Sequence, residues 1–251
     1  MRWSRIFCCV LVFASMVDGQ TTLTFDAASV KRAGRILRPT GGPGTNDPGR
    51  IRYPSISLKD LVKTSYSAKD YELTGPSWMD TETFAVDATM PPDTTQEQFR
   101  VMLQNLLAER FKLTVHRESR DISGYSLVVA KNGPKMHNSG SGPATARSPD
   151  DDLRRSEGAG GVGLLGIRVT MTRLADKLSD EVQRPVIDAT GLKTRYDFEL
   201  RFRASMASSP EAEDLPDIFS ALQGLGLKLE PAKGSVSVIV IDHVEKAQTE
   251  N

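Results

Sequence analysis

Residues 95–119 read TQEQFRVMLQNLLAERFKLTVHRES, and this stretch decides the fold class. Thr95 and Gln98 match a capping box, in which two side chains close the first turn of a helix. Apolar residues then recur at the spacing of one helix face, and a strand is expected at 112–119. The face consists of Phe99, Met102, Leu103, Leu106 and Leu107. The stretch therefore predicts a helix that buries one apolar face against a sheet.

The same unit, a helix followed by two strands, recurs four times along the chain. Each helix has a candidate first residue whose short polar side chain can accept hydrogen bonds from free amides. These residues are Ser57, Thr95, Thr170 and Asp217. The expected strand pairs are 71–74 with 83–89, 112–119 with 125–131, 185–188 with 195–202, and 227–230 with 235–241.

The recurrence has a nearly constant offset, which favours an internal duplication. Met171 follows Leu58 by 113 residues, while Thr190 follows Thr74 and Leu222 follows Leu106 by 116. Chance recurrence of short helix and strand units is the alternative. We expect an α+β fold of two similar halves, each β-α-β-β-α-β-β, with helices packed on small antiparallel or mixed sheets.

Residues 1–19 are predicted to be a cleavable signal peptide. Arg2 and Arg5 supply a positive start, residues 6–16 are almost wholly apolar, and Gln20 would begin the mature chain. An uncleaved membrane anchor is the alternative, but the apolar run is shorter than the roughly 20 residues that a spanning helix needs.

Both cysteines of the chain, Cys8 and Cys9, lie within this apolar run. Cleavage would therefore leave a mature chain without disulfides, thiolate metal ligands or cysteine nucleophiles. We expect export to the periplasm or the extracellular space, with no stable membrane insertion after the leader is removed.

A polar segment divides the mature chain. Residues 132–162 are rich in glycine, serine, proline and charge and lack apolar periodicity, so a disordered linker is expected there. The expected organisation is a signal peptide at 1–19, a first α+β half at 20–131, the linker, and a second α+β half at 163–251.

Charge is balanced, with 32 basic and 32 acidic residues in the whole chain. No polybasic run or basic stripe accompanies them, so the sequence offers no electrostatic support for a nucleic-acid partner.

His116 is the most suggestive candidate for chemistry. Strand alternation places it on the same face as Glu118, and such a pair can supply two metal ligands. A catalytic zinc needs three protein ligands, and no spacing ties His137 or His243 to this place. A surface histidine beside a carboxylate is the favoured interpretation.

Carboxylate clusters are a second candidate. Asp80 with Glu82, or Asp188 with Asp197 and Glu199, would support acid and base catalysis if they met in one cleft. Nothing in their spacing requires such a meeting, and exposed carboxylates are the usual case.

Glycines 158, 160 and 163 fit the pattern of a dinucleotide-binding loop. That loop works only between a strand and a helix, and here a polar segment precedes the glycines and a strand follows them, so we assign them to the linker. Trp78, after a Gly-Pro-Ser turn, is expected to close one end of a small core, and an exposed binding role is the alternative.

Several of these segments resemble a family of known sequences. They are residues 25–31, 75–78, 102–120, 125–135, 184–191, 196–198 and 238–242. In this order they resemble the acidobacterial "Soli" family of exported proteins with a domain of unknown function. The resemblance implies export, and in some relatives a link to a membrane metallopeptidase of the antibiotic-sensor type. It supplies no activity, cofactor or catalytic residue.

The sequence thus assigns no catalytic, cofactor-binding or metal-binding residue and implies no cofactor. We expect a non-enzymatic binding module for a protein or cell-envelope partner. An exported hydrolase that uses surface carboxylates or His116 is the alternative function.

Overall fold

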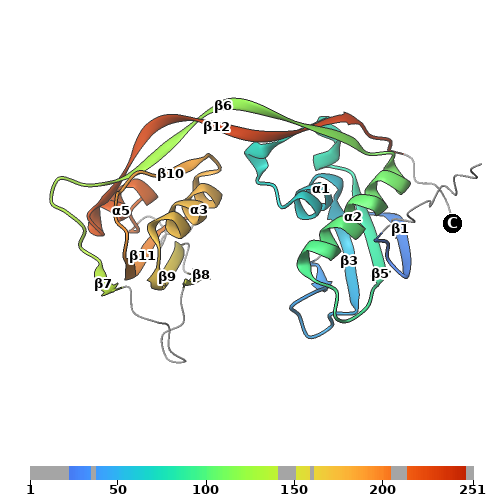
Figure 1. Ribbon diagram of the computed structural model, residues 1–251, viewed down its shortest axis with the longest axis horizontal. Helices are drawn as coiled ribbons and strands as arrows, with labels where there is room; N and C mark the ends of the chain where they lie inside the picture. Colours follow the sequence, from blue (N-terminus) through green and yellow to red (C-terminus); the bar gives the residue numbers. More distant parts are fainter. Residues whose placement is uncertain (1–22, 35–37, 141–150, 159–160, 205–213, 247–251) are drawn as a thin grey trace, which may run out of the picture.

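The computed structural model describes residues 23–34, 38–140, 151–158, 161–204 and 214–246. Two lobes, each a sheet covered by helices, are joined by a long two-stranded ribbon that arches from one to the other (Figure 1). The α+β class expected from the sequence is confirmed. The predicted signal peptide at 1–19, with Cys8 and Cys9, lies outside the described residues.

The first lobe has a four-stranded sheet in the order β1-β5-β3-β2, with all neighbours antiparallel. Its strands are β1 (Ala27–Ala33), β2 (Thr40–Gly41), β3 (Arg50–Ser57) and β5 (Thr83–Thr89), and its helices are α1 (Leu58–Tyr66) and α2 (Gln96–Phe111). Two short 3-10 helices, η1 (Asp70–Glu72) and η2 (Ser77–Asp80), precede β5. The apolar face of α2 packs on the sheet. The rings of Phe84 and Phe111 meet there edge to face, with their centroids 4.8 Å apart.

The second lobe has a sheet in the order β7-β11-β9-β8. Its strands are β7 (His137–Gly140), β8 (Asp152–Gly158), β9 (Gly161–Val169) and β11 (Arg195–Arg203), covered by α3 (Met171–Val182) and α5 (Ile218–Gly224). The two sheets correspond strand by strand. The positions of β1, β5, β3 and β2 in the first sheet are those of β7, β11, β9 and β8 in the second, and the strands follow one another along the chain in the same order. This correspondence supports an internal duplication, which stays a prediction.

The ribbon consists of β6 (Thr114–Val129) and β12 (Leu227–His243), which pair antiparallel along almost their whole length. Short parallel strands extend it at opposite ends. Strand β10 (Val186–Asp188) pairs with β6, and β4 (Leu73–Thr74) pairs with β12.

The ribbon corrects two expectations about strands. The pairs predicted at 112–119 with 125–131 and at 227–230 with 235–241 are each one continuous strand. Gly124, Pro231 and Gly234 interrupt the apolar patterns, but they lie within the paired ribbon and not in turns. Gly124 allows close approach there, because a Cβ atom at this position would lie 2.2 Å from the carbonyl oxygen of Pro185.

Each ribbon strand contributes to both cores. On β6, Val115 packs against the first core while Leu127 is fully buried in the second. On β12, Leu227 belongs to the second core and Ile241 packs against the first. Each lobe therefore takes residues from both expected halves of the chain.

The disordered linker expected at 132–162 is wrong for residues 137–140, 152–158 and 161–162, which lie in strands. Residues 137–140 form β7 and residues 152–158 form β8, and both belong to the sheet of the second lobe. Both are edge strands with little of their surface buried, so they are polar, and composition alone suggests disorder. Residues 141–150 and 159–160 of this segment lie outside the described residues.

The four predicted helix starts are confirmed. The side chains of Ser57, Thr95, Thr170 and Asp217 each accept a hydrogen bond from the backbone amide three residues later. Thr95 and Gln98 form the complete capping box. Within the described part of the chain, no helix has the length and apolarity needed to cross a membrane.

Candidate functional site: the outer face of the first sheet

The structure places His116 on the ribbon beside two carboxylates. Its Nδ1 lies 2.7 Å from Asp242 Oδ1, and its Nε2 lies 3.8 Å from Glu118 Oε2. The two carboxylates therefore lie at opposite edges of the imidazole, so one ion cannot use all three groups. Among the described residues, no group of three or more histidine, cysteine, aspartate or glutamate side chains is arranged to hold a metal ion.

The second-lobe carboxylates have separate structural partners. Asp188 accepts hydrogen bonds from Thr172 and Thr190, while Asp197 accepts them from Ser139 Oγ and from the amide of Arg168. Burial opposes ionisation of Asp197, but these hydrogen bonds outweigh it and lower its pKa.

The carboxylates of the first lobe, Asp80 and Glu82, also bind different cations. Asp80 binds Lys59 at 2.7 Å, and Glu82 lies 3.6 Å from Lys246. The ammonium group of Lys246 in turn lies 5.1 Å from the ring centre of Trp78, which packs against the first core as expected.

The glycine pattern also has a structural role. Gly158 ends β8 and Gly163 lies in β9, where a Cβ atom would come within 2.7 Å of Ser156 Oγ. No helix follows, which agrees with the rejection of a dinucleotide loop, although the assignment to a linker is wrong for these two residues. Gly160 lies outside the described residues.

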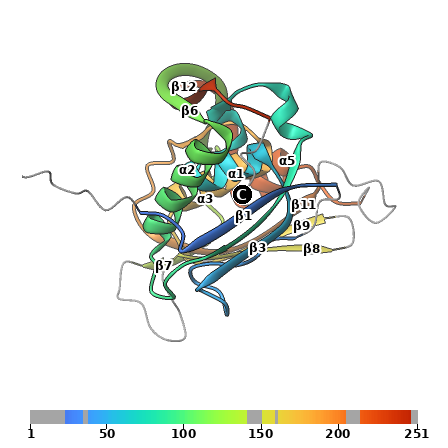
Figure 2. The ribbon, with the colours of Figure 1, turned by 90° about the vertical axis from the view of Figure 1, so that its right-hand side faces the viewer.

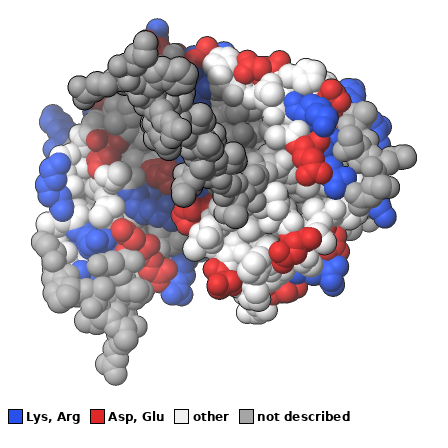
Figure 3. Space-filling model, turned by 45° about the vertical axis from the view of Figure 1, so that its right-hand side comes forward, with Lys and Arg blue, Asp and Glu red and all other residues white. Residues whose placement is uncertain are grey.

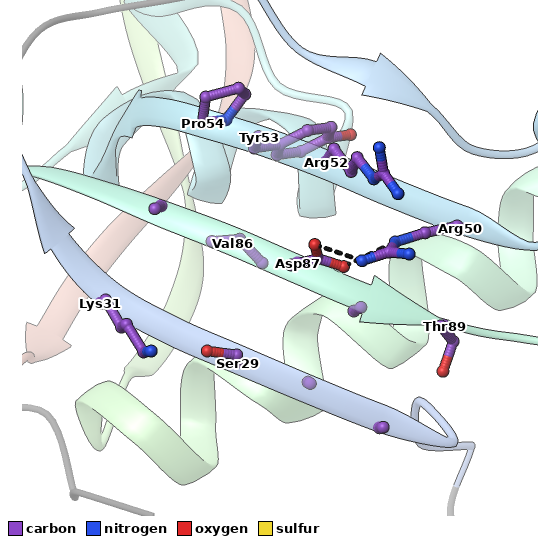
Figure 4. A pocket seen from close by; sticks show the side chains of 13 residues that line it. Ser29, Lys31, Arg50, Arg52, Tyr53, Pro54, Val86, Asp87 and Thr89 are labelled. Carbon is purple, nitrogen blue, oxygen red and sulfur yellow. Dashed lines mark hydrogen bonds and ion pairs between the residues drawn. The ribbon is translucent and has the colours of Figure 1, made fainter.

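A hollow lies over the sheet of the first lobe, on the face away from the helices (Figure 4). Its volume is about 720 Å³, and all of its lining residues belong to β1, β3 and β5. Alternation along these strands sends apolar side chains such as Phe84 and Val86 to the helices and leaves small or charged side chains outside. We call this face the outer face.

Strand register arranges the outer face in rows. Ser29 on β1, Asp87 on β5 and Arg52 on β3 are directly opposite one another and form the middle row. Arg50 lies in the next row, opposite Thr89. Small side chains at Ala27, Ala85 and Ser29 keep the middle of the face low, which makes the hollow.

Three cations and one carboxylate line the outer face. Arg50 binds Asp87 through two hydrogen bonds of 2.8 and 2.6 Å, which raise the pKa of the guanidinium and hold that of Asp87 below its usual value. Lys31 and Arg52 form no ion pair with any residue that the structure describes. With three cations and one carboxylate, the outer face therefore carries a net charge of +2.

This arrangement suits binding more than catalysis. Guanidinium and ammonium groups at an open surface attract anions, but the hollow contains no histidine, cysteine or paired carboxylate for proton transfer. Sequence reasoning missed this face because its charges come from three separate strands. The available signal was the two-residue spacing of Arg50 and Arg52 just before the helix predicted to start at Ser57, where the expected order of elements requires a strand.

The equivalent face of the second sheet is less charged. The charged residues that line a hollow of about 440 Å³ there are Glu157 on β8 and Glu199 and Arg201 on β11, beside the exposed Leu165. On the side of the molecule in Figure 3, basic and acidic residues are interspersed and form no extended patch of one sign.

Comparison with known sequences identifies a family. A family model described as "Protein of unknown function (DUF3738)" matches residues 59–244, which include the ribbon and most of both lobes. No curated protein and no solved structure matches the chain.

Proposed function

The chain belongs to the DUF3738 family of proteins of unknown function, and we propose that it is a non-enzymatic module that binds a partner protein through the outer face. The observation that carries the proposal is the pair of cations, Lys31 and Arg52, that lie on either side of a hollow of about 720 Å³ and form no ion pair with a described residue.

The position of the outer face supports this role. It lies opposite the first core, so a partner can contact it without displacing either helix of the lobe. Figure 2 shows β1 and β3 toward the viewer, with α2 and the ribbon to one side and above. Rigid strands hold the charged side chains, which limits the conformational entropy lost on binding.

We further propose that the protein is exported and acts in the periplasm or outside the cell, and that it belongs to the "Soli" group within its family. Support comes from the positive start and short apolar run of residues 1–19 and from the sequence resemblance. Expression with its own leader, followed by N-terminal sequencing of the exported protein, should give Gln20 as the first residue. An intact Met1 on the exported chain would contradict cleavage.

The hydrolase alternative has less support. Its candidate groups, His116, Asp188 and Asp197, are engaged with different partners on different elements. A hydrolase panel with the wild-type protein and the His116→Ala variant tests it directly. Activity that disappears in this variant would replace the binding proposal.

Site-specific photo-crosslinking in the native host tests the binding role. A photoreactive residue in place of exposed Ala27, at the rim of the outer face, should give one dominant adduct. The matched control is the same residue in place of Glu97, which is exposed on α2 of the same lobe. The same mixture of adducts from both positions would overturn the proposal.

A further inference from the structure

The chemistry of the outer face also indicates what kind of partner it fits. The hollow is bounded only by three neighbouring strands of one sheet, so its upper side is open. Sites for small molecules bury most of the ligand surface, which an open sheet face cannot do. A chain that continues beyond the hollow on both sides fits this shape better.

Two positions on the face attract negative charge, and one between them repels it. Lys31 lies on β1 and Arg52 on β3, with Asp87 on β5 between those strands (Figure 4). The two cations are two strands and one row apart, which places their Cα atoms about 12 Å from each other. An extended peptide spans this distance in about four residues, and residues four apart point to the same side.

We propose that the partner presents an extended acidic peptide across β1, β5 and β3, with one carboxylate at Lys31 and a second, four residues away, at Arg52. This inference rests on the proposed function and adds the partner's chemistry. Arg52 can bind its carboxylate through two parallel hydrogen bonds, while Lys31 acts as a point charge. Asp87 disfavours a negative residue at the centre of the peptide.

Fluorescence anisotropy with the full mature chain tests the proposal. The probe is a labelled nonapeptide, Gly-Ser-Glu-Gly-Ser-Gly-Glu-Gly-Ser, and the control peptide has glutamine in place of both glutamates. We expect the glutamine peptide to bind at least about tenfold more weakly than the acidic peptide. We also expect 0.5 M salt to weaken the binding of the acidic peptide strongly.

Variants of the protein locate the site. Lys31→Gln and Arg52→Gln should each weaken binding about three- to fivefold, because each removes one exposed charge pair. Arg201→Gln, on the equivalent face of the second lobe, is the matched control and should change affinity by less than about twofold. All three side chains project from exposed faces, and equal thermal unfolding would show that the fold is retained.

Three results would overturn the proposal. Equal losses in all three variants would indicate unspecific attraction. Displacement of the peptide by inorganic phosphate at equal concentration would indicate a small-anion site. Concentration-dependent dimerisation that Arg52→Gln abolishes would make a second copy the occupant. If crosslinking from Ala27 still captures one partner while the acidic peptide fails, only this inference falls and the binding role stands.

Discussion

The ammonium group of Lys69, in the first lobe, lies 2.6 Å from the Oδ1 atom of Asp176 on α3 of the second lobe. The same ammonium also donates to the backbone carbonyl of Asp176 at 2.7 Å and lies 3.3 Å from Asp180. Lys69 therefore links the two lobes through side-chain contacts that are separate from the strand pairing of the ribbon.

Replacing Lys69 by glutamine should loosen the lobes without unfolding either. Partly exposed ion pairs contribute at most about 1 kcal/mol, so the free energy of unfolding should change little. Spin labels at exposed Glu97 and Lys193 should show a broader distance distribution in Lys69→Gln than in the wild type. In the wild type, 0.5 M salt should also broaden this distribution. An unchanged distribution in the variant would show that Lys69 does not restrain the lobes.

The close packing of the ribbon against the chain just before β10 should depend on Gly124. A Cβ atom there would lie 2.2 Å from a backbone oxygen of Pro185, so Gly124→Ala must displace the chain just before β10. We expect a loss of about 1–3 kcal/mol in the free energy of unfolding by chemical denaturation. Gly158→Ala is the control, because nothing lies within 4 Å of its Cβ position. Equal effects of the two substitutions would refute the steric argument.

Local signals predicted the helices well. Ser57 and Thr95 cap their helices because a cap depends only on residues within one turn. The ribbon could not be predicted in this way, since Gly124 is a turn signal in the sequence and lies beside Pro185 only after the lobes form. Likewise β7 and β8 are stabilised by their neighbours in the sheet and have little apolar pattern of their own.

The candidate site could not be predicted from the sequence for a similar reason. Lys31, Arg52 and Asp87 come from three segments, and only the register of β1, β5 and β3 brings them to one face. In the sequence they are single charges in ordinary strands. His116 and Glu118 could be predicted as neighbours from the sequence, because residues two apart on one strand share a face whatever the tertiary structure.

Asp197 should make stability depend on pH in the acid range. Its hydrogen bonds with Ser139 and the amide of Arg168 lower its pKa in the folded chain below that of the unfolded chain, about 3.9. A carboxyl group with a lowered pKa stabilises the fold above the unfolded pKa, and this stabilisation disappears as pH falls through the folded pKa.

Asp197→Asn should therefore lower the free energy of unfolding by about 1–3 kcal/mol near pH 7. The difference from the wild type should shrink as pH falls below about 4. Denaturant titrations from pH 7 to pH 2 measure it, and Glu199→Gln on the same strand corrects for the loss of one negative charge. A difference that stays constant with pH would contradict this role of Asp197.

Asp87 gives a prediction of the opposite sign, a substitution that should improve binding. Its carboxylate neutralises Arg50 and lies between Lys31 and Arg52, so it reduces the attraction of the outer face for anions. In Asp87→Asn the face keeps all three cations and loses its one negative charge, while the side chain keeps nearly the same volume.

Asp87→Asn should accordingly bind the acidic nonapeptide about three- to fivefold more tightly than the wild type, with an increased dependence on salt. Because Arg50 lowers the pKa of Asp87, the wild type should not reach this affinity by mild acidification to pH 5. Glu199→Gln, which removes a negative charge from the other lobe, should leave the affinity within about twofold. If Asp87→Asn binds more weakly, the carboxylate instead positions Arg50 for the ligand, and the proposed placement of the acidic chain at Lys31 and Arg52 is wrong.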